Sequence, residues 1–437
     1  MQSARFQNEP VLRRLWWLEP ALLFAVVIGG TMLAAFAQTD TAFRLYGTPK
    51  YIGTSHLLLA FAAILAFAIG RWLATATGRV PSSTPQAAET VVRFWFWLAT
   101  GLTLFGYAVW LVIGVKNGFS LGTLREFLTT DDPQLADTMF FEMFATWKGI
   151  TTCTQFGIAA VPLGLWLFFR GQRIVAWPLA LLIGLAGLRG LIFSERLALI
   201  ELVVPGFVVA IRFALLGRPL PPFRRFAVQL FPVLGLAALL LVFGGFEYFR
   251  SWRYYVNDFD SYAEFTLWRI GGYYTTAHNN GALALETQPT YPLPYATLRQ
   301  FWHIPGLAST PLGYSNLTGF DPSTRHVGML EQFATPELNS EGGLFQPALD
   351  FGLSGFLLFW FGCGFISGRL YRTYLVGTVA GLTLYPLVFL AILETPRFLY
   401  LCYPRSLPAI VTLLVVAWLT SRAAQPASAP SAAIVPA

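Results

Sequence analysis

The stretch GLRGLIFSERLALIEL, residues 187–202, places charged side chains between two apolar segments that are each long enough to cross a lipid bilayer. Arg189, Glu195 and Arg196 lie within it, and Glu201 follows on the next apolar segment. A charged side chain at the centre of a bilayer costs about 3 kcal/mol or more unless it is paired or hydrated. The stretch therefore predicts a membrane-spanning fold with a polar site at the turn between two of its helices.

The composition of the whole chain is that of a helical membrane protein. Of its 437 residues, 55% are hydrophobic and 12% are charged, whereas soluble domains carry roughly 25% charged residues. The net charge of +7 comes mainly from arginines scattered at the ends of apolar segments, which is unlike the basic face of a nucleic-acid-binding domain. We therefore expect membrane lipid, and no nucleic acid, among its partners.

Apolar runs of about 20 residues recur along the chain and predict an all-α polytopic protein with about ten transmembrane helices. We expect one integral membrane domain over residues 1–437, with a disordered cytoplasmic tail, rich in Ala, Pro and Ser, at 421–437. The first run also resembles a cleavable signal peptide, but the many spans that follow favour a retained helix. The predicted spans are 20–37, 55–75, 94–114, 150–169, 174–190, 196–216, 226–245, 347–366, 374–393 and 405–420.

The arginines that flank these spans predict the orientation of the chain. If both termini are cytoplasmic, the short loops rich in arginine all fall on the cytoplasmic side, as the positive-inside rule requires. The opposite side then receives the loops 115–149 and 393–404, the 189–196 turn and a large extracytoplasmic loop, 246–346. The arginines on the cytoplasmic side are Arg5, Arg13, Arg14, Arg71, Arg79, Arg93, Arg170, Arg173, Arg218, Arg224, Arg225, Arg369, Arg372 and Arg422.

Four arginines on the outward side predict an anion-binding site. A helix from Arg173 to Arg189 is about 24 Å long at 1.5 Å per residue, shorter than the roughly 30 Å hydrocarbon core. Arg189 and Arg196 are therefore expected slightly below the outer membrane surface, at the depth of a lipid-linked phosphate, which arginine binds in a bidentate fork. Arg397 and Arg405 form a further outward pair. Two structural alternatives remain open: Glu195 closes the hairpin by pairing with Arg189, and Glu394 pairs with the arginines that follow it.

Aromatic residues recur at steps of four and three in the segment FEYFRSWRYYVNDFDSYAEFTLWR, 246–269. This spacing predicts one stripe of a helix. The stripe is either an interfacial helix at the level of the lipid headgroups or a sugar-stacking surface that includes Trp252, Tyr255 and Phe259, because the apolar faces of pyranose rings pack on aromatic rings.

The acid–base candidates are few. His326, in DPSTRHVGMLEQ, and Glu195 are the two predicted general bases, with Asp350 as the next candidate. No HExxH, GxSxG or P-loop motif appears in the large outward segment, and the three cysteines lack metal-ligand spacing. The sequence therefore predicts neither a metal nor another cofactor. Gly364 and Gly368, spaced as GxxxG, predict close packing between helices.

The stretch NSEGGLFQPALDFGLSGFLLFWFGCGFISGRLYR, 339–372, resembles the Wzy-type oligosaccharide repeat-unit polymerases. The shared features are an approach containing Asn339, an Asp350-Phe351-Gly352 mouth, a glycine-rich span and the short basic loop that ends at Arg372. FSERLALIELVVP, 193–205, is similar to the family's Gly-Ser-Arg stretch, with Arg196 as its arginine, although Glu195 replaces the usual small residue.

The resemblance implies an architecture similar to the GT-C-like polymerases and ligases, in a bacterial cytoplasmic (inner) membrane. The implied activity is metal-independent glycosyl transfer that polymerises undecaprenyl-pyrophosphate-linked oligosaccharide repeat units into O-antigen, capsule or exopolysaccharide. A chain-length regulator and the flippase of the same pathway are the implied protein partners. In this scheme Arg189, Arg196, Arg397 and Arg405 hold the pyrophosphate, and His326, Glu195 or Asp350 takes the acceptor proton.

Three other functions fit part of the pattern. An O-antigen ligase uses the same donor but transfers glycan to lipid A-core. A flippase or transporter of lipid-linked glycans would place charges at mid-membrane depth on several helices, whereas here the polar residues gather on one side. A structural protein of a polysaccharide assembly machine is the third alternative.

Overall fold

The computed structural model describes residues 12, 15–76, 85–129, 138–144, 147, 149–193, 196–215 and 221–422, which form helices, turns and loops without a β-strand. The predicted tail lies outside the described residues from 423 onward. Eight of the described helical segments are long and apolar enough to cross a membrane: Pro20–Ala37, Thr54–Ala76, Ala88–Lys116, Thr151–Phe169, Arg173–Ile192, Arg196–Leu215, Gln346–Val376 and Pro404–Arg422. Two shorter apolar helices, Phe231–Glu247 and Val379–Glu394, stand at the other two predicted spans. An all-helical, polytopic fold is thus confirmed in length and composition.

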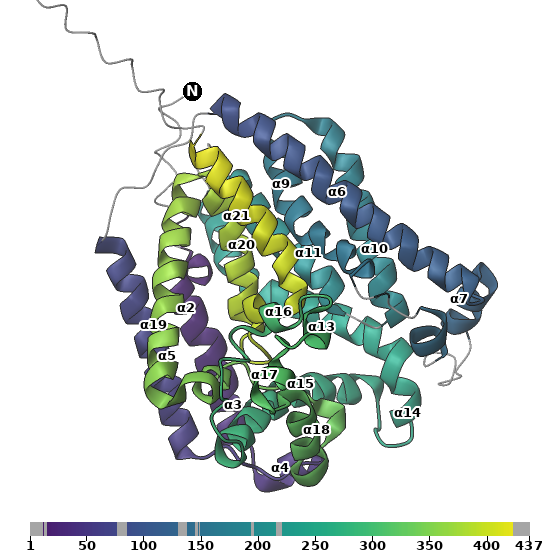
Figure 1. Ribbon diagram of the computed structural model, residues 1–437, viewed down its shortest axis with the longest axis vertical. Helices are drawn as coiled ribbons and strands as arrows, with labels where there is room; N and C mark the ends of the chain where they lie inside the picture. Colours follow the sequence, from purple (N-terminus) through teal and green to yellow (C-terminus); the bar gives the residue numbers. More distant parts are fainter. Residues whose placement is uncertain are drawn as a thin grey trace, which may run out of the picture.

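The long helices pack side by side in one bundle (Figure 1). The first spanning segment consists of α2 (Pro20–Phe24), η3 (Ala25–Gly29) and α3 (Gly30–Ala37), and it packs on α5 and on α15 (Tyr262–Thr287). The other bundle helices are α5 (Thr54–Ala76), α6 (Pro85–Lys116), η5 (Thr151–Phe156) with α9 (Gly157–Phe169), η6 (Arg173–Val175) with α10 (Ala176–Phe193), α11 (Arg196–Leu215), α13 (Phe231–Glu247), α19 (Gln346–Val376), α20 (Val379–Glu394) and η11 (Pro404–Ser406) with α21 (Leu407–Arg422).

The outer face of α5 has the character of a lipid-facing surface. Large apolar side chains at steps of three and four are exposed along it, among them Leu58, Leu65 and Trp72 with exposed fractions of 63%, 61% and 69%. The opposite face buries small residues such as Ala63 and Gly70. In water such a stripe would be a costly apolar patch, whereas lipid solvates it and leaves the small residues free for close helix packing.

Close packing of α5 on α19 depends on glycines that face each other. A Cβ atom added to Gly364 would lie 2.0 Å from the carbonyl oxygen of Phe67, and one added to Gly70 would lie 2.0 Å from that of Phe361. Gly368 approaches the backbone of α5 in the same way, at Arg71. The prediction of close packing at the GxxxG pair is therefore confirmed, with α5 as the partner.

Much of the segment 246–346, expected as a large loop, is helical. It lies at the end of the bundle opposite the N-terminus (Figure 1), and the middle of α15 is buried against neighbouring helices. The other short helical segments of the chain are η2 (Trp16–Leu18), α4 (Asp40–Leu45), α7 (Leu121–Thr129), η4 (Thr138–Met143), α12 (Pro222–Gln229), η7 (Tyr248–Trp252), α14 (Arg253–Tyr255), α16 (Arg299–Trp302), η8 (Leu307–Ser309), α17 (Tyr314–Thr318), α18 (Pro322–Phe333), η9 (Pro336–Leu338) and η10 (Tyr400–Cys402).

The prediction of a single helix across 246–269 is wrong. The chain leaves its helical path after α14 and begins α15 at Tyr262. Ser261 and Glu264 start this second helix, because the Ser261 hydroxyl accepts from the Glu264 amide and the Glu264 carboxylate accepts from the Asp260 amide, each at 3.2 Å. Such reciprocal capping satisfies amide groups that the first turn leaves unpaired.

We predict that Gly364→Ala lowers the thermal unfolding midpoint of the purified protein, whereas Gly362→Ala, on the same helix, does not. Forcing a methyl group into the packed α5–α19 interface should cost about 1–3 kcal/mol. Nothing lies within 4 Å of a Cβ at Gly362, and alanine there gains about 0.5–1 kcal/mol in helix propensity. Equal midpoints for the two variants would contradict the close packing of α5 on α19.

Candidate functional site

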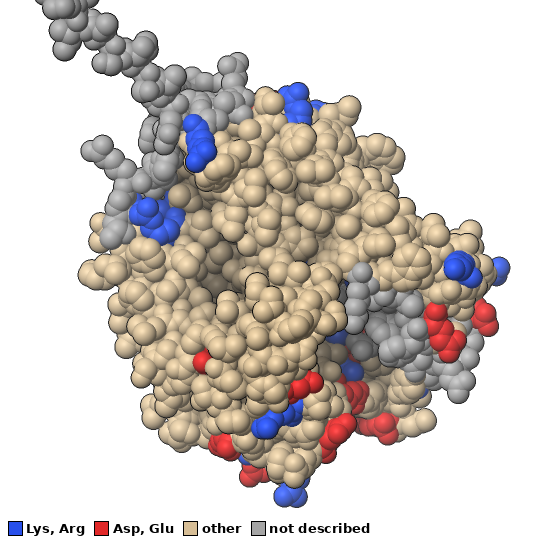
Figure 2. Space-filling view, viewed as in Figure 1, with Lys and Arg blue, Asp and Glu red and all other residues tan. Residues whose placement is uncertain are grey.

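Charged residues gather at the end of the bundle where α15 and α18 lie (Figures 1 and 2). Among the described residues on the face in Figure 2, the middle of the molecule carries few charged groups, and Lys and Arg groups mark the end near the N-terminus. At the opposite end Arg and Lys mix with Asp and Glu, partly inside a recess. The mixed end is therefore where paired charges and polar chemistry are concentrated.

Three arginines from distant parts of the chain converge on one tyrosine ring, and we call them the arginine cluster. Arg196 begins α11, Arg269 lies on α15 and Arg397 follows α20. Their guanidinium carbons lie 4.9, 5.4 and 5.5 Å, respectively, from the centre of the Tyr273 ring. Arg196 also lies 3.7 Å over the ring of Phe243. Stacking on aromatic faces fixes the planes of the guanidinium groups and leaves their edges for anions.

Glu247, at the end of α13, is shared by two members of the cluster. Its Oε1 accepts from Arg196 at 2.7 Å, and its Oε2 lies 3.4 Å from Nε of Arg269. The side chain of Glu247 is 1% exposed. A buried carboxylate of this kind is stable only while its cations are in place.

The outer members of the cluster have separate carboxylate partners. Glu394 lies 3.1 Å from Arg397 at the end of α20, and Glu337 accepts from Arg269 at 2.6 Å. Glu337 also accepts from the hydroxyl of Tyr255, where burial and the carboxylate raise the pKa of the phenol to about 12. Because Glu337 is 46% exposed, the buried part of the site holds three arginines and two carboxylates.

One N–H donor of the arginine cluster is buried without a hydrogen-bond partner among the described residues. This donor is Nε of Arg397. A buried donor without a partner costs about 1–3 kcal/mol, and an anion placed against the cluster would recover that cost. Anion binding by Arg196 and Arg397 stays a prediction.

The four predicted anion-binding arginines do not share one environment. Arg196 and Arg397 belong to the cluster, and Arg269, which we did not predict, completes it. Arg405 forms a two-pronged ion pair with Glu201, with N–O distances of 2.7 and 2.8 Å, so its charge is matched. Arg189 donates to the hydroxyl of Thr154 at 2.8 Å.

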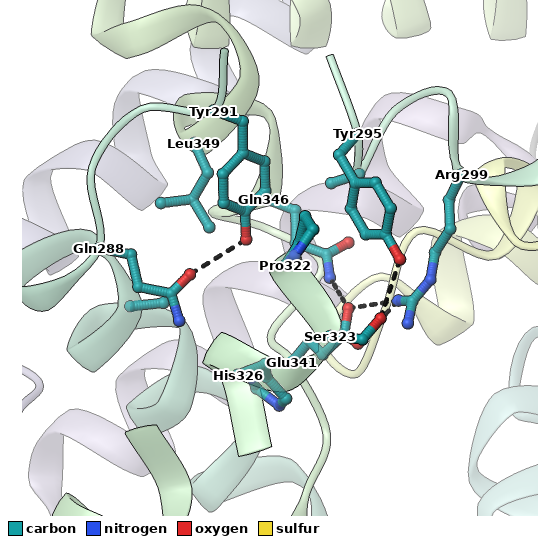
Figure 3. Close-up of a pocket in the computed structure, with 12 residues that line it drawn as sticks. Gln288, Tyr291, Tyr295, Arg299, Pro322, Ser323, His326, Glu341, Gln346 and Leu349 are labelled. Carbon is teal, nitrogen blue, oxygen red and sulfur yellow. Dashed lines mark hydrogen bonds and ion pairs between the residues drawn. The ribbon is translucent and has the colours of Figure 1, made fainter. Parts of the chain in front are cut away.

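A second polar site lies beside the cluster, in a cavity between the end of α15, α18 and the loop before α19 (Figure 3). About 360 Å³ of empty space lies there, counting the mouth that is open to solvent, and Glu341 and Arg299 lie on the wall of the cavity. Nη1 of Arg299 lies 2.7 and 2.6 Å from the two carboxylate oxygens of Glu341, and Gln346 donates to the same carboxylate. Burial by itself would raise the pKa of Glu341, but Arg299 outweighs it and the pKa lies below the usual 4.5. Glu341 is therefore ionised at neutral pH.

His326, a predicted base, lines this cavity from α18. Asp321 starts α18 by accepting from the amides of Ser323 and Thr324, which fixes the turn that carries His326. The imidazole Nε2 lies 3.3 Å from the carbonyl oxygen of Asn339. The structure thus places His326 where it can reach a ligand in the cavity.

Asp350, the third predicted base, holds a loop. Each of its carboxylate oxygens accepts two hydrogen bonds, from the amides of Tyr295, Ala296 and Thr297 and from the Thr297 hydroxyl, at 2.6–3.0 Å. A carboxylate oxygen has two acceptor positions, so these four hydrogen bonds occupy all the acceptor positions of the Asp350 carboxylate. The geometry favours a positioning role, in which Asp350 anchors the wall of the cavity. Glu195, the other predicted base, lies outside the described residues.

The predicted sugar-stacking residues pack on other aromatic rings. Tyr255 stacks on Phe265 with ring centres 5.4 Å apart, and Phe259 lies 5.1 Å from Trp268. Trp252 packs on Tyr262 at 5.4 Å. These contacts tie η7, α14 and the turn after it to α15, and sugar stacking remains a prediction.

The cavity and the arginine cluster share a backbone junction. The Gly342 amide donates to the carbonyl oxygen of Arg397 at 3.0 Å. Gly342 has φ of +70°, and a Cβ there would lie 2.4 Å from the carbonyl oxygen of Ala277, while one on Gly343 would lie 2.4 Å from the backbone of Phe398. Two glycines therefore let the loop that carries Glu341 press against the loop that carries Arg397.

No group of three or more His, Cys, Asp or Glu residues in the described part of the chain is arranged to hold a metal ion.

Comparisons of the chain with models of protein families, with curated proteins and with solved structures find no match.

We predict that Glu247→Gln lowers the thermal unfolding midpoint far more than Glu337→Gln, which makes the same chemical change. Removing one partner of a buried ion pair costs about 3–5 kcal/mol, and Glu247 balances both Arg196 and Arg269. The half-exposed Glu337 should contribute about 0–1 kcal/mol. Similar shifts for the two variants would show that the buried pair does not stabilise this end of the bundle.

Proposed function

We propose that the protein polymerises oligosaccharide repeat units carried on undecaprenyl pyrophosphate, at the outer face of a bacterial cytoplasmic membrane. The observation that carries the proposal is the convergence of Arg196, Arg269 and Arg397 on one ring, with a buried donor of Arg397 unpartnered among the described residues. Arginine forks match phosphate oxygens, and a site of low dielectric strengthens that attraction.

The depth of the cluster supports a lipid-linked anion. Arg196 opens α11, Glu247 ends α13 and Glu394 ends α20, so the cluster lies level with the ends of apolar helices. The headgroup region of a bilayer begins at that level, and a pyrophosphate attached to a polyprenyl chain would be held there.

In the proposed reaction, a hydroxyl oxygen of the acceptor glycan attacks the anomeric carbon of the donor glycan. The new glycosidic bond forms as the bond from that carbon to the pyrophosphate oxygen breaks, and undecaprenyl pyrophosphate leaves with the electron pair. The hydroxyl proton passes to a base, for which His326 is the best-placed described candidate. The arginine cluster stabilises the charge that develops on the leaving group.

Arginine at the ends of the spans supports an orientation with both termini cytoplasmic. Reporter fusions after Arg170 and Arg372 should read cytoplasmic, and a fusion at Pro322 should read extracytoplasmic. A cytoplasmic signal at Pro322 would place the arginine cluster on the wrong side for a lipid-linked donor and refute the proposal.

The activity itself is tested with purified protein in nanodiscs and the lipid-linked repeat unit of the source strain as sole substrate. We predict a ladder of longer lipid-linked glycans, with undecaprenyl pyrophosphate released once per new bond. Dependence on added lipid A-core, with one transfer per acceptor, would identify a ligase instead. A change in sidedness without growth of the glycan would identify a flippase.

Arg196→Lys should lower the rate of ladder formation by about 10²–10³-fold, the usual cost of losing one preorganised donor to a developing anion. A lysine keeps the charge that balances Glu247, so the variant should fold, but it lacks the planar fork. Arg44→Ala, an exposed arginine on α4 at the same end of the bundle, is the matched control. A rate within threefold of wild type for Arg196→Lys would show that Arg196 does not stabilise the leaving group.

A further inference from the structure

The cavity beside the arginine cluster offers hydrogen bonds of both kinds with little net charge. Arg299 and Gln346 supply N–H donors, Glu341 supplies carboxylate oxygens, and Tyr295 and Ser323 supply hydroxyl groups that lie 3.0 Å apart. Glu341 and Arg299 are ionised together, so their charges cancel. An anion would be repelled by Glu341 and a cation by Arg299, whereas a neutral ligand with several hydroxyl groups meets partners for each of them.

The walls of the cavity suit one face of a sugar ring. The roughly 360 Å³ of empty space there counts the open mouth of the cavity, so a ring bound at it would lie partly in solvent. Leu349, Pro322 and Ala284 add apolar lining, and the ring of Tyr291 lies beside Leu349 (Figure 3). The hydroxyl of Tyr291 donates to Gln288 at 3.1 Å, which holds the ring in place.

Glu341 has an acceptor position left for a ligand. Its Oε1 receives one hydrogen bond, from Arg299, while its Oε2 receives one from Arg299 and one from Gln346. A carboxylate oxygen accepts two, so Oε1 can accept from a sugar hydroxyl. The imidazole of His326 lines the same cavity.

We propose that this cavity binds the terminal sugar ring of the acceptor glycan, with Glu341 as a binding residue that accepts from a ring hydroxyl. The Gly342–Arg397 hydrogen bond would then hold the acceptor subsite in register with the site for the donor pyrophosphate. The identification of the bound glycan as the acceptor rests on the proposed function, whereas the binding of a sugar ring does not.

The test measures saccharide binding without any lipid-linked substrate. The full chain is placed in nanodiscs, because sugar-based detergents would compete, and is titrated calorimetrically with methyl glycosides of hexoses, deoxyhexoses and N-acetylhexosamines. At least one glycoside should bind saturably, with a stoichiometry of about one glycoside per protein chain. Glu341→Gln should weaken that binding about tenfold or more, since it replaces a charged hydrogen-bond acceptor by a neutral one.

The matched control is Glu331→Gln, the same change on the exposed side of α18, which should bind like wild type. Gln288→Leu, at a residue that lines the cavity, provides a second variant if Glu341→Gln unfolds, and it should weaken binding severalfold. The inference is overturned if no glycoside binds, if both cavity variants bind like wild type, or if Glu341→Gln removes binding of inorganic pyrophosphate instead.

The two proposals fail separately in these experiments. Glycoside binding that depends on Glu341, without any ladder from lipid-linked substrate, refutes the polymerase and keeps the sugar site. A ladder from a protein whose cavity variants retain wild-type glycoside binding keeps the polymerase and refutes the sugar site. With both proposals correct, Glu341→Gln raises the concentration of lipid-linked acceptor needed for half-maximal rate.

Discussion

A buried carboxylate shared by two arginines sets the organisation of the end of the helix bundle where α15 lies. Glu247 lies at the end of α13 and contacts Arg196 at the start of α11 and Arg269 on α15. Removing charges of this kind from water costs several kcal/mol for each ion, and only close, mutually paired geometry offsets the cost. Three helices must therefore end or pass at one place, and the ring of Tyr273 is fixed among the cations they supply.

The pairing also explains how a hydrophobic chain tolerates so many arginines near lipid. Arg405 is matched by Glu201, and Arg397 by Glu394, so both of these cations at the helix ends have a near carboxylate. Pairing and ligand binding are compatible because a guanidinium has five N–H groups, and one carboxylate does not occupy all of them. In our account the carboxylates keep the arginines ordered in the resting protein, and the phosphate groups of the donor bind to the donors that remain.

The apolar runs were enough to locate the long apolar helices, but not α15, which lies in the segment expected as a loop. Each of the ten predicted runs is helical, because a segment in lipid must satisfy its backbone groups internally. Aromatic periodicity was misleading at 246–269, where Ser261 and Glu264 carry a capping signature that starts a new helix and that the regular spacing of rings concealed. The positions of helices thus follow from local sequence, while their interruptions depend on short polar signals.

The site was only partly predictable, for a physical reason. Arg196 and Arg397 stand out because they interrupt or flank apolar runs. Arg269, Glu247 and Glu341 acquire their importance from partners distant in the sequence, and a single sequence does not reveal such partners. The SEGG stretch at 340–343 carries a local signal for Glu341, since two adjacent glycines beside a carboxylate indicate close backbone approach.

The central claim is that the arginine cluster binds pyrophosphate, and its most direct test is the thermal stability of the protein in nanodiscs with inorganic pyrophosphate. At constant ionic strength, the unfolding midpoint should rise saturably with pyrophosphate, because a ligand at 100 times its Kd stabilises the folded state by about 2.7 kcal/mol. The rise should be retained in Arg44→Ala, be much smaller in Arg196→Lys and be weaker with sulfate. An unchanged midpoint, or an equal rise in Arg196→Lys, would contradict the account.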